Sequence, residues 1–145
     1  MQKPYYITTP IYYANAKIHF WNLYTSIIAD VMARSKRLHG YDVLFATGTD
    51  ENGQKMVQVA EKEGKDVMTF LDEVVAQDKE VMNACDISYT DFIRTTEPRH
   101  HKFVQSVLQK TFESGDIYEG EYEWLYCIGG EGFKKESDLI EYEWQ

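Results

Sequence analysis

The sequence predicts a mixed α/β fold: a parallel half-sheet with flanking helices, followed by an antiparallel β-ribbon at the C-terminal end. Three observations favour it. Short apolar runs alternate with longer stretches in which apolar residues recur every three or four positions, which is typical of strands alternating with amphipathic helices. Glycines such as Gly40 and Gly64 punctuate these segments. After Gly115 the apolar period changes to two, as in half-buried strands.

The first strand is expected over residues 4–11, and the helix that follows should stop at Gly40. We expect the large apolar residues of this helix, spaced three and four apart, to share one inward face: Leu23, Tyr24, Ile27, Ile28, Val31, Met32 and Leu38. The second strand, over residues 42–47, is largely apolar without alternation. That pattern predicts a parallel strand covered on both faces.

Two helices are expected next, a short one over 54–63 and a longer one over about 66–84, and then a third strand over 91–95. The apolar residues of the longer helix are expected to face inward: Phe70, Leu71, Val74, Val75, Val81 and Met82. Thr96 offers a hydroxyl cap and Pro98 suits the first turn of a helix, so another helix should begin here.

Aromatic residues alternate with glutamates beyond Gly115, and the pattern returns near the C-terminus: Tyr118, Tyr122, Trp124, Tyr126 and Ile128, then Ile140, Tyr142 and Trp144. We assign residues 1–116 to the α/β unit and 117–145 to a β-ribbon. Half of a doubly wound sheet leaves an unpaired edge strand, and exposed edges invite pairing. We therefore expect either a homodimer or coverage of that edge by the ribbon.

The chain has 145 residues, the size of one ordinary domain, and a net charge of −9. This charge disfavours indiscriminate binding to nucleic acid. There is no long apolar span and no secretory signal pattern, so a soluble cytoplasmic protein is expected. Cys85 and Cys127 cannot form a disulfide framework and are expected to be reduced, partly buried thiols.

The most informative segment is residues 11–22, a loop between the first strand and the first helix. The first turn of a helix has unpaired N–H groups and the positive end of a dipole, so such junctions often bind phosphates. Asp50 lies just beyond the second strand, where open α/β sheets bind ligands. A turn-capping role for Asp50 is the plainer alternative.

Several ordered blocks carry a resemblance. They are Tyr-Tyr-Ile-Thr-Thr-Pro-Ile-Tyr-Tyr-Ala-Asn from residue 5, Thr-Gly-Thr-Asp-Glu from residue 47, Phe-Ile-Arg-Thr-Thr from residue 92, Gly-Asp-Ile-Tyr from residue 115 and Glu-Ser-Asp-Leu from residue 136. With their separations, these blocks resemble the methionyl-tRNA synthetase family over nearly the whole chain.

The resemblance implies the N-terminal half of a class I, Rossmann-like catalytic domain, in which ATP and methionine form methionyl-adenylate before transfer to tRNA. It implies that Ile11, Tyr13 and Asp50 line the amino-acid pocket, with Asp50 pairing with the ammonium group. His19 matches the first histidine of the family's His-x-Gly-His nucleotide signature, which contacts the ATP phosphates.

Two positions depart from that signature. Trp21 stands where the glycine would leave room for adenine, and Asn22 replaces the second histidine, which helps stabilise the transition state. We expect Trp21 to fill or block the adenine pocket, and Asn22 to donate a hydrogen bond without carrying positive charge. The plainer alternative makes Trp21 a core aromatic and Asn22 a helix N-cap, which also argues against ATP chemistry. Asn52 stands where the family usually has histidine.

The residues near Cys127 bear on whether the chain holds zinc. Family members often carry a zinc knuckle whose first ligand pair is Cys-x-x-Cys, whereas this chain has Cys127 and Gly130, so we expect no structural zinc. ATP binding is doubtful, and no cofactor is expected. The family's second half-sheet, its Lys-Met-Ser-Lys-Ser loop and its anticodon-binding domain are not found in these residues.

The expected function is therefore a synthetase-like catalytic-domain fragment that does not aminoacylate alone and meets tRNA only if other domains complete it. One alternative is a non-catalytic or engineered binding or scaffold module. Another is a binder of methionine or a similar small molecule that uses Asp50 beside Tyr13 and Trp21.

Overall fold

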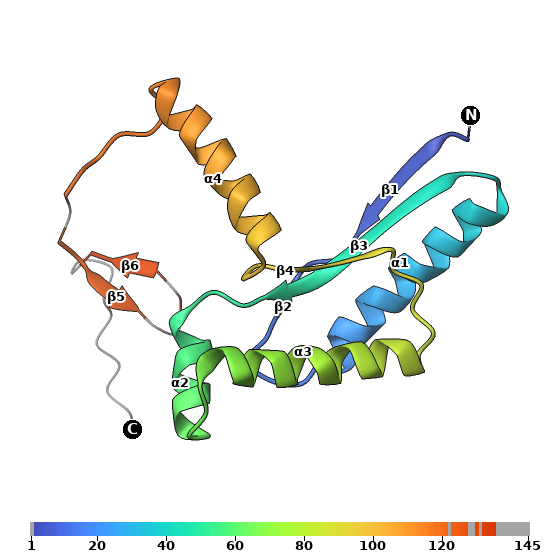
Figure 1. Ribbon diagram of the computed structural model, residues 1–145, viewed down its shortest axis with the longest axis horizontal. Coiled ribbons are helices and arrows are strands. Elements are labelled where there is room, and N and C mark those ends of the chain that lie inside the picture. Colours follow the sequence, from blue (N-terminus) through green and yellow to red (C-terminus); the bar gives the residue numbers. More distant parts are fainter. Residues whose placement is uncertain (1, 122, 128–129, 131, 136–145) are drawn as a thin grey trace.

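The computed structural model describes residues 2–121, 123–127, 130 and 132–135. Its main sheet has strands β1 (Pro4–Thr8), β2 (Tyr12–Tyr13), β3 (Asp42–Asp50) and β4 (Asp91–Arg94), and every pairing is parallel. Strand β3 is central (Figure 1). Strands β1 and β2 follow one another along one side of it, and β4 pairs with the other side. The predicted parallel half-sheet is confirmed.

The first strand is split, which corrects the single strand expected over 4–11. Thr9 still donates its backbone N–H to Ala46 at 3.2 Å, but Pro10 has no N–H to continue the ladder. The chain resumes pairing as β2, opposite Thr49 and Asp50. This break aligns Tyr13 with the last residue of β3.

In the part of the chain that the structure describes, four helices accompany the sheet: α1 (Phe20–Leu38), α2 (Gln54–Lys62), α3 (Val67–Ala84) and α4 (Pro98–Glu113). Helices α1 and α3 lie on the same side of the sheet, whereas α4 points away on the other side (Figure 1). The core between the sheet and these two helices includes Phe45, Met82 and Phe92. A second core joins α2 to α3 around Met56 and Leu71. The inward face predicted for the helix over 66–84 is confirmed in α3, which buries Phe70, Leu71, Val74, Val75 and Met82.

Helix α1 turns a different face to the core from the one predicted. Its buried residues are small or polar (Ser26, Ala29, Asp30 and Ala33), and they let the helix lie close to β1 and β3. Most of the large residues expected inside are exposed: Tyr24, Ile27, Ile28, Val31, Met32 and Leu38. Helix α1 has one face of small residues and one face of large apolar residues, each at helical spacing. The size of the side chains does not show which face packs against the sheet.

The sheet is covered on one face only, which corrects the expectation for the second strand. Burial alternates along the first half of β3, with Val43 and Phe45 buried and Leu44 51% exposed. Tyr6 on β1 is 64% exposed on the same open face. Helix α4 buries no residue. The apolar run in the sequence therefore does not require two covering layers within the described residues.

Helix α4 begins after Glu97, with Pro98 in the first turn as predicted, but its N-cap has no side-chain hydrogen bond. Thr96, expected as the hydroxyl cap, instead donates its hydroxyl to Glu51. The cap prediction was wrong, because the N-cap is Glu97 and Thr96 lies one residue before it, with its hydroxyl directed to the buried carboxylate.

The predicted ribbon is present in part as an antiparallel pair, β5 (Leu125–Cys127) and β6 (Gly132–Lys134). It pairs with itself, so within the described ranges neither edge strand of the main sheet gains it as a neighbour. The predicted strand residues Tyr122, Ile128, Ile140, Tyr142 and Trp144 lie outside the described residues. Cys85 and Cys127 are free and exposed rather than partly buried. No helix in the described part is both long and apolar enough for a membrane crossing.

Candidate functional site

The carboxyl end of β3 brings together two residues that the sequence placed in the amino-acid pocket. Tyr13 is the register partner of Asp50 across β2 and β3. The pairing continues one residue further, where the Ala14 N–H donates to the Asp50 carbonyl at 3.1 Å. Ile11 lies just before β2 and is exposed. These three positions therefore lie along one short stretch of the sheet edge.

The Asp50 carboxylate has one oxygen engaged and one open. Its Oδ1 accepts the backbone N–H of Asn52 at 3.2 Å, which is the turn-capping bond considered as the plainer alternative. No other hydrogen bond to this carboxylate is found among the described residues, and the residue is partly exposed. Capping therefore leaves Oδ2 available to a ligand. Lys55 Nζ lies 5.8 Å from the Tyr13 ring centre.

His19 occupies the N-cap of α1, in an extended conformation. Its Nδ1 accepts the backbone N–H of Asn22 at 3.5 Å, at the long limit of a hydrogen bond. Asn22 thus lies inside the first turn rather than at the cap, so the alternative that made it the N-cap is wrong. Because His19 is exposed at the positive end of the helix dipole, its ring can face an anion.

Trp21 is not a core aromatic, which rules out the other half of that alternative. Its side chain is 70% exposed on the first turn of α1. The indole packs edge-to-face against Phe20 at 5.5 Å and Tyr24 at 6.4 Å between ring centres. The three rings form an exposed aromatic cluster beside His19. Whether the indole excludes adenine remains a prediction.

A buried ion pair lies directly behind Asp50. The Glu51 side chain is fully buried, and its Oε1 accepts Nε–H of Arg94 at 2.7 Å and the Thr49 hydroxyl at 2.6 Å. Its backbone N–H donates to the Thr95 hydroxyl at 2.8 Å, and Oε2 accepts the Thr96 hydroxyl. The network joins the ends of β3 and β4. The hydrogen bond with Glu51 is the main cause that raises the pKa of Arg94.

Sequence reasoning missed this network, although a signal was present. Thr49-Asp50-Glu51 follows the strand predicted over 42–47, and Arg94-Thr95-Thr96 spans the end of the strand predicted over 91–95. The carboxyl ends of neighbouring parallel strands meet at one edge of a sheet, so opposite charges at both ends predict a pair. Gly48 completes the junction, because a Cβ there would lie 2.0 Å from the carbonyl oxygen of Ile93.

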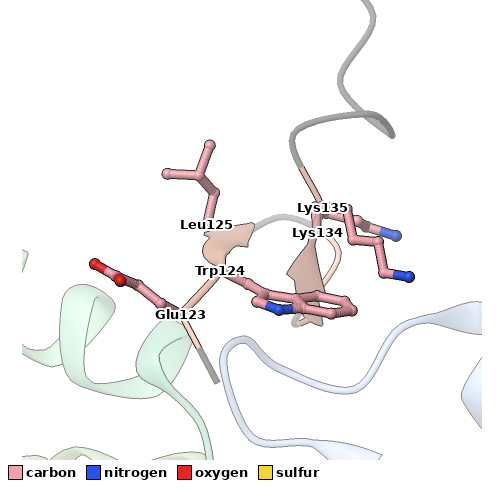
Figure 2. Close-up of a pocket in the computed structure, with 5 residues that line it drawn as sticks. All are labelled: Glu123, Trp124, Leu125, Lys134 and Lys135. Atoms are coloured by element: carbon pink, nitrogen blue, oxygen red, sulfur yellow. The ribbon is translucent and has the colours of Figure 1, made fainter. Parts of the chain in front are cut away.

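Hollows among the described residues lie both beside this edge of the sheet and in the ribbon. A shallow cavity of about 320 Å³ is lined by Asn52, His100, His101, Val104 and Gln105, beside the loop after Asp50. Another belongs to the ribbon alone, where Lys135 Nζ stands 5.0 Å from the Trp124 ring centre (Figure 2). The ribbon hollow takes no lining residue from the sheet edge.

The ribbon turn keeps a hydrogen bond to sulfur. Cys127 Sγ accepts the N–H of Gly130 at 3.4 Å. Within the described ranges, no three His, Cys, Asp or Glu side chains lie close enough together to hold a metal ion. One thiolate is a poor start for four-coordinate zinc, and the expectation of no structural zinc stays a prediction.

Comparison with known proteins identifies the family. The chain is 49% identical over 141 residues to the methionine–tRNA ligase of Caldanaerobacter subterraneus and 52% identical over 138 residues to that of Clostridium tetani. These matches cover 97% and 95% of this chain, which spans 22% of the length of each relative.

A solved structure agrees. Mycobacterium tuberculosis methionyl-tRNA synthetase in complex with methionyl-adenylate superposes with a TM-score of 0.88 and 39% identity, over 94% of this chain and 27% of that one. The family profile described as tRNA synthetases class I (M) matches residues 5–141. The chain therefore belongs to the class I tRNA synthetases of the methionyl type.

Proposed function

We propose that this chain supplies the amino-acid-binding side of a methionine-activating catalytic site. Its relatives are named methionine–tRNA ligases, and a structural relative was solved with methionyl-adenylate. The observation that carries the proposal is the pairing of Tyr13 with Asp50 at the carboxyl edge of the sheet, with one carboxylate oxygen left open. An ammonium group is the natural partner for that oxygen.

Each residue of the candidate site has a proposed role, which family membership suggests and the geometry supports. Asp50 binds the ammonium group of methionine, while Tyr13 and Ile11 contact the rest of the amino acid. His19, at the positive end of α1, faces the phosphates of ATP. Asn22 supplies a neutral hydrogen-bond donor where a charged imidazole would stabilise the developing negative charge better.

Trp21 is proposed to hinder ATP. In the family signature a glycine lets the nucleotide approach the backbone, and an indole at this position adds volume beside the first turn. The ring is 70% exposed, and the rings that it contacts, Phe20 and Tyr24, are exposed as well. We therefore propose that the chain binds methionine more readily than ATP.

We further propose that residues 1–145 do not aminoacylate tRNA by themselves. A reacting centre needs groups that converge from several sides, and the described site offers one edge of a sheet and one helix end. The 145 residues contain no Lys-Met-Ser-Lys-Ser run. We assign the chain to cytoplasmic protein synthesis, and tRNA becomes a partner only when other segments complete the site.

Methionine titration tests the binding proposal. Calorimetry should show methionine binding to the chain, and Asp50→Asn should weaken it at least about tenfold, because a charge-assisted hydrogen bond is lost. Asp42→Asn, at the opposite end of β3, is the matched control and should bind as the parent does. Equal binding by Asp50→Asn, or no binding by the parent, would refute the assignment. ATP–pyrophosphate exchange above background would overturn the proposed lack of chemistry.

We also propose that the 145-residue chain forms a homodimer through its open sheet face, where Tyr6 and Leu44 are exposed and no element covers them within the described residues. Large uncovered apolar patches mark contact surfaces. Light scattering after size exclusion should give twice the chain mass, and Leu44→Lys should give a monomer. A parent chain that elutes as a monomer at all concentrations would contradict this.

A further inference from the structure

Helix α3 carries a buried carboxylate that the candidate site does not use. Asp78 is 1% exposed, and its neighbours one turn away on the same helix, Val75 and Met82, belong to the apolar core. Burial raises the pKa of this carboxyl, and the Ile18 N–H and the charge of Lys17 offset the rise only in part. An apolar residue would fill the same space without the cost of removing a carboxylate from water.

The partner of Asp78 lies sixty residues earlier in the chain. Its Oδ1 accepts the backbone N–H of Ile18 at 2.7 Å, and this is the one hydrogen bond to the carboxylate within the described ranges. The Ile18 side chain also packs against the core below the sheet. Ile18 is thus held at two points, through its side chain and its N–H.

Ile18 ends the loop that joins the two halves of the candidate site. The loop runs from Tyr13 in β2 to His19, which caps α1. At its start, Ala14 is fully buried in the core that α3 forms with α2. Both ends of the loop therefore rest on α3, the second through Asp78.

We propose that Asp78 is a positioning residue for this loop: its carboxylate fixes the Ile18 N–H and so holds His19 and the end of the loop that begins at Tyr13. The inference rests on the proposed function for its consequence on binding, but the positioning itself is independent of any ligand. If Asp78 only filled space in the core, a leucine could replace it. If Asp78 positions the loop, its replacement must keep an atom that accepts the Ile18 N–H.

Three variants separate these roles. Asp78→Leu fills the core and removes the acceptor, Asp78→Asn keeps an acceptor oxygen, and Asp66→Ala removes a different carboxylate, the α3 N-cap that accepts the Thr69 N–H at 3.1 Å. The readout is amide hydrogen exchange by NMR at Ile18 and His19, with Phe45 in β3 as the internal reference. Urea unfolding of each variant measures global stability.

Exchange at Ile18 should accelerate about tenfold or more in Asp78→Leu, the size expected for a lost hydrogen bond to a charged acceptor. The exchange rate at Phe45 should not change in this variant. In Asp78→Asn the exchange rate at Ile18 should stay within about threefold of the parent rate, and in Asp66→Ala it should equal the parent rate. Unchanged Ile18 exchange in Asp78→Leu, or equal acceleration at Ile18 and Phe45, would overturn the positioning role.

Methionine titration then links the loop to binding. Asp78→Leu should weaken methionine binding severalfold, and Asp78→Asn should restore it. If the parent does not bind methionine, the proposed function fails while the exchange result still decides the role of Asp78. Parent-like methionine binding by Asp78→Leu, with Ile18 exchange accelerated, would refute the coupling between loop and site.

Discussion

The ion pair behind Asp50 should be the most sensitive polar feature of the fold. Replacing Arg94 by methionine keeps the volume of the side-chain stem and removes the charge that faces Glu51. The Glu51 side chain has no solvent exposure, so water cannot take the place of the guanidinium. The carboxylate would keep only its two threonine hydroxyl donors.

The expected magnitude follows from this burial. Removing one partner of a buried ion pair costs about 3–5 kcal/mol, because the remaining charge is left uncompensated. The second contact of Arg94, at 2.6 Å to an Asp72 side chain that is 62% exposed, adds little. Nη2 of Arg94 is buried and has no hydrogen-bond partner among the described residues, so its loss carries no further cost. The whole free energy of unfolding of a domain of this size is about 5–15 kcal/mol.

A double-variant cycle isolates the pair. Urea unfolding of the parent, Arg94→Met, Glu51→Gln and the double variant should show the double variant recovering at least about 2 kcal/mol of the loss in Arg94→Met. Arg99→Met is the control: it removes an arginine that pairs with Glu97 and Asp91 and donates to the Phe92 carbonyl at 2.9 Å. It should cost much less unfolding free energy than Arg94→Met, because its ion pairs are exposed. If Arg94→Met lost no more unfolding free energy than Arg99→Met, or if the double variant recovered none of it, the buried ion pair would not have the proposed effect on stability.

Two other predictions concern stability. Gly48→Ala should destabilise the fold by about 3 kcal/mol or more in urea unfolding, because the new Cβ would meet the backbone oxygen of Ile93, which cannot rotate away; a loss under 1 kcal/mol would contradict this. Burial raises the pKa of the Asp30 carboxyl, but hydrogen bonds from Ser88 and Arg34 outweigh it and leave the pKa lowered. Its contribution to stability is therefore present above about pH 4, the ordinary pKa of aspartate, and is lost as the pH falls through the lower folded value. Asp30→Asn should accordingly lose stability at pH 7 and converge on the parent in acid, and a pH-independent difference would exclude this assignment.

The sequence was sufficient for the order and type of the elements because local patterns determine them. The periodicity of residues 66–84 predicted α3 and its inward face, and the apolar runs predicted the parallel strands. Period two after Gly115 predicted the ribbon, of which β5 and β6 are described. The resemblance also assigned Tyr13 and Asp50 to one site. The two residues are register partners in the sheet, and their role in a binding site stays a prediction.

The orientation of the elements was less predictable, because it depends on what each face meets. Helix α1 presents alanines and a serine to the sheet and leaves its large aliphatic residues exposed, although hydrophobicity alone favours the opposite. Burial of Asp78 and Glu51 could not be anticipated from composition, since charged residues are rarely buried without partners. Their partners, Ile18 and Arg94, are 60 and 43 positions away in the chain.

Obstruction of the nucleotide side by Trp21 is decided by calorimetric ATP titration of the parent, Trp21→Gly and Phe20→Gly. Phe20 is the matched control, because it lies on the same helical turn and is equally exposed at 70%. We predict weak or absent ATP binding by the parent and by Phe20→Gly, and clear binding by Trp21→Gly. Parent binding as tight as that of Trp21→Gly would contradict the claim that the indole obstructs the nucleotide side of the site.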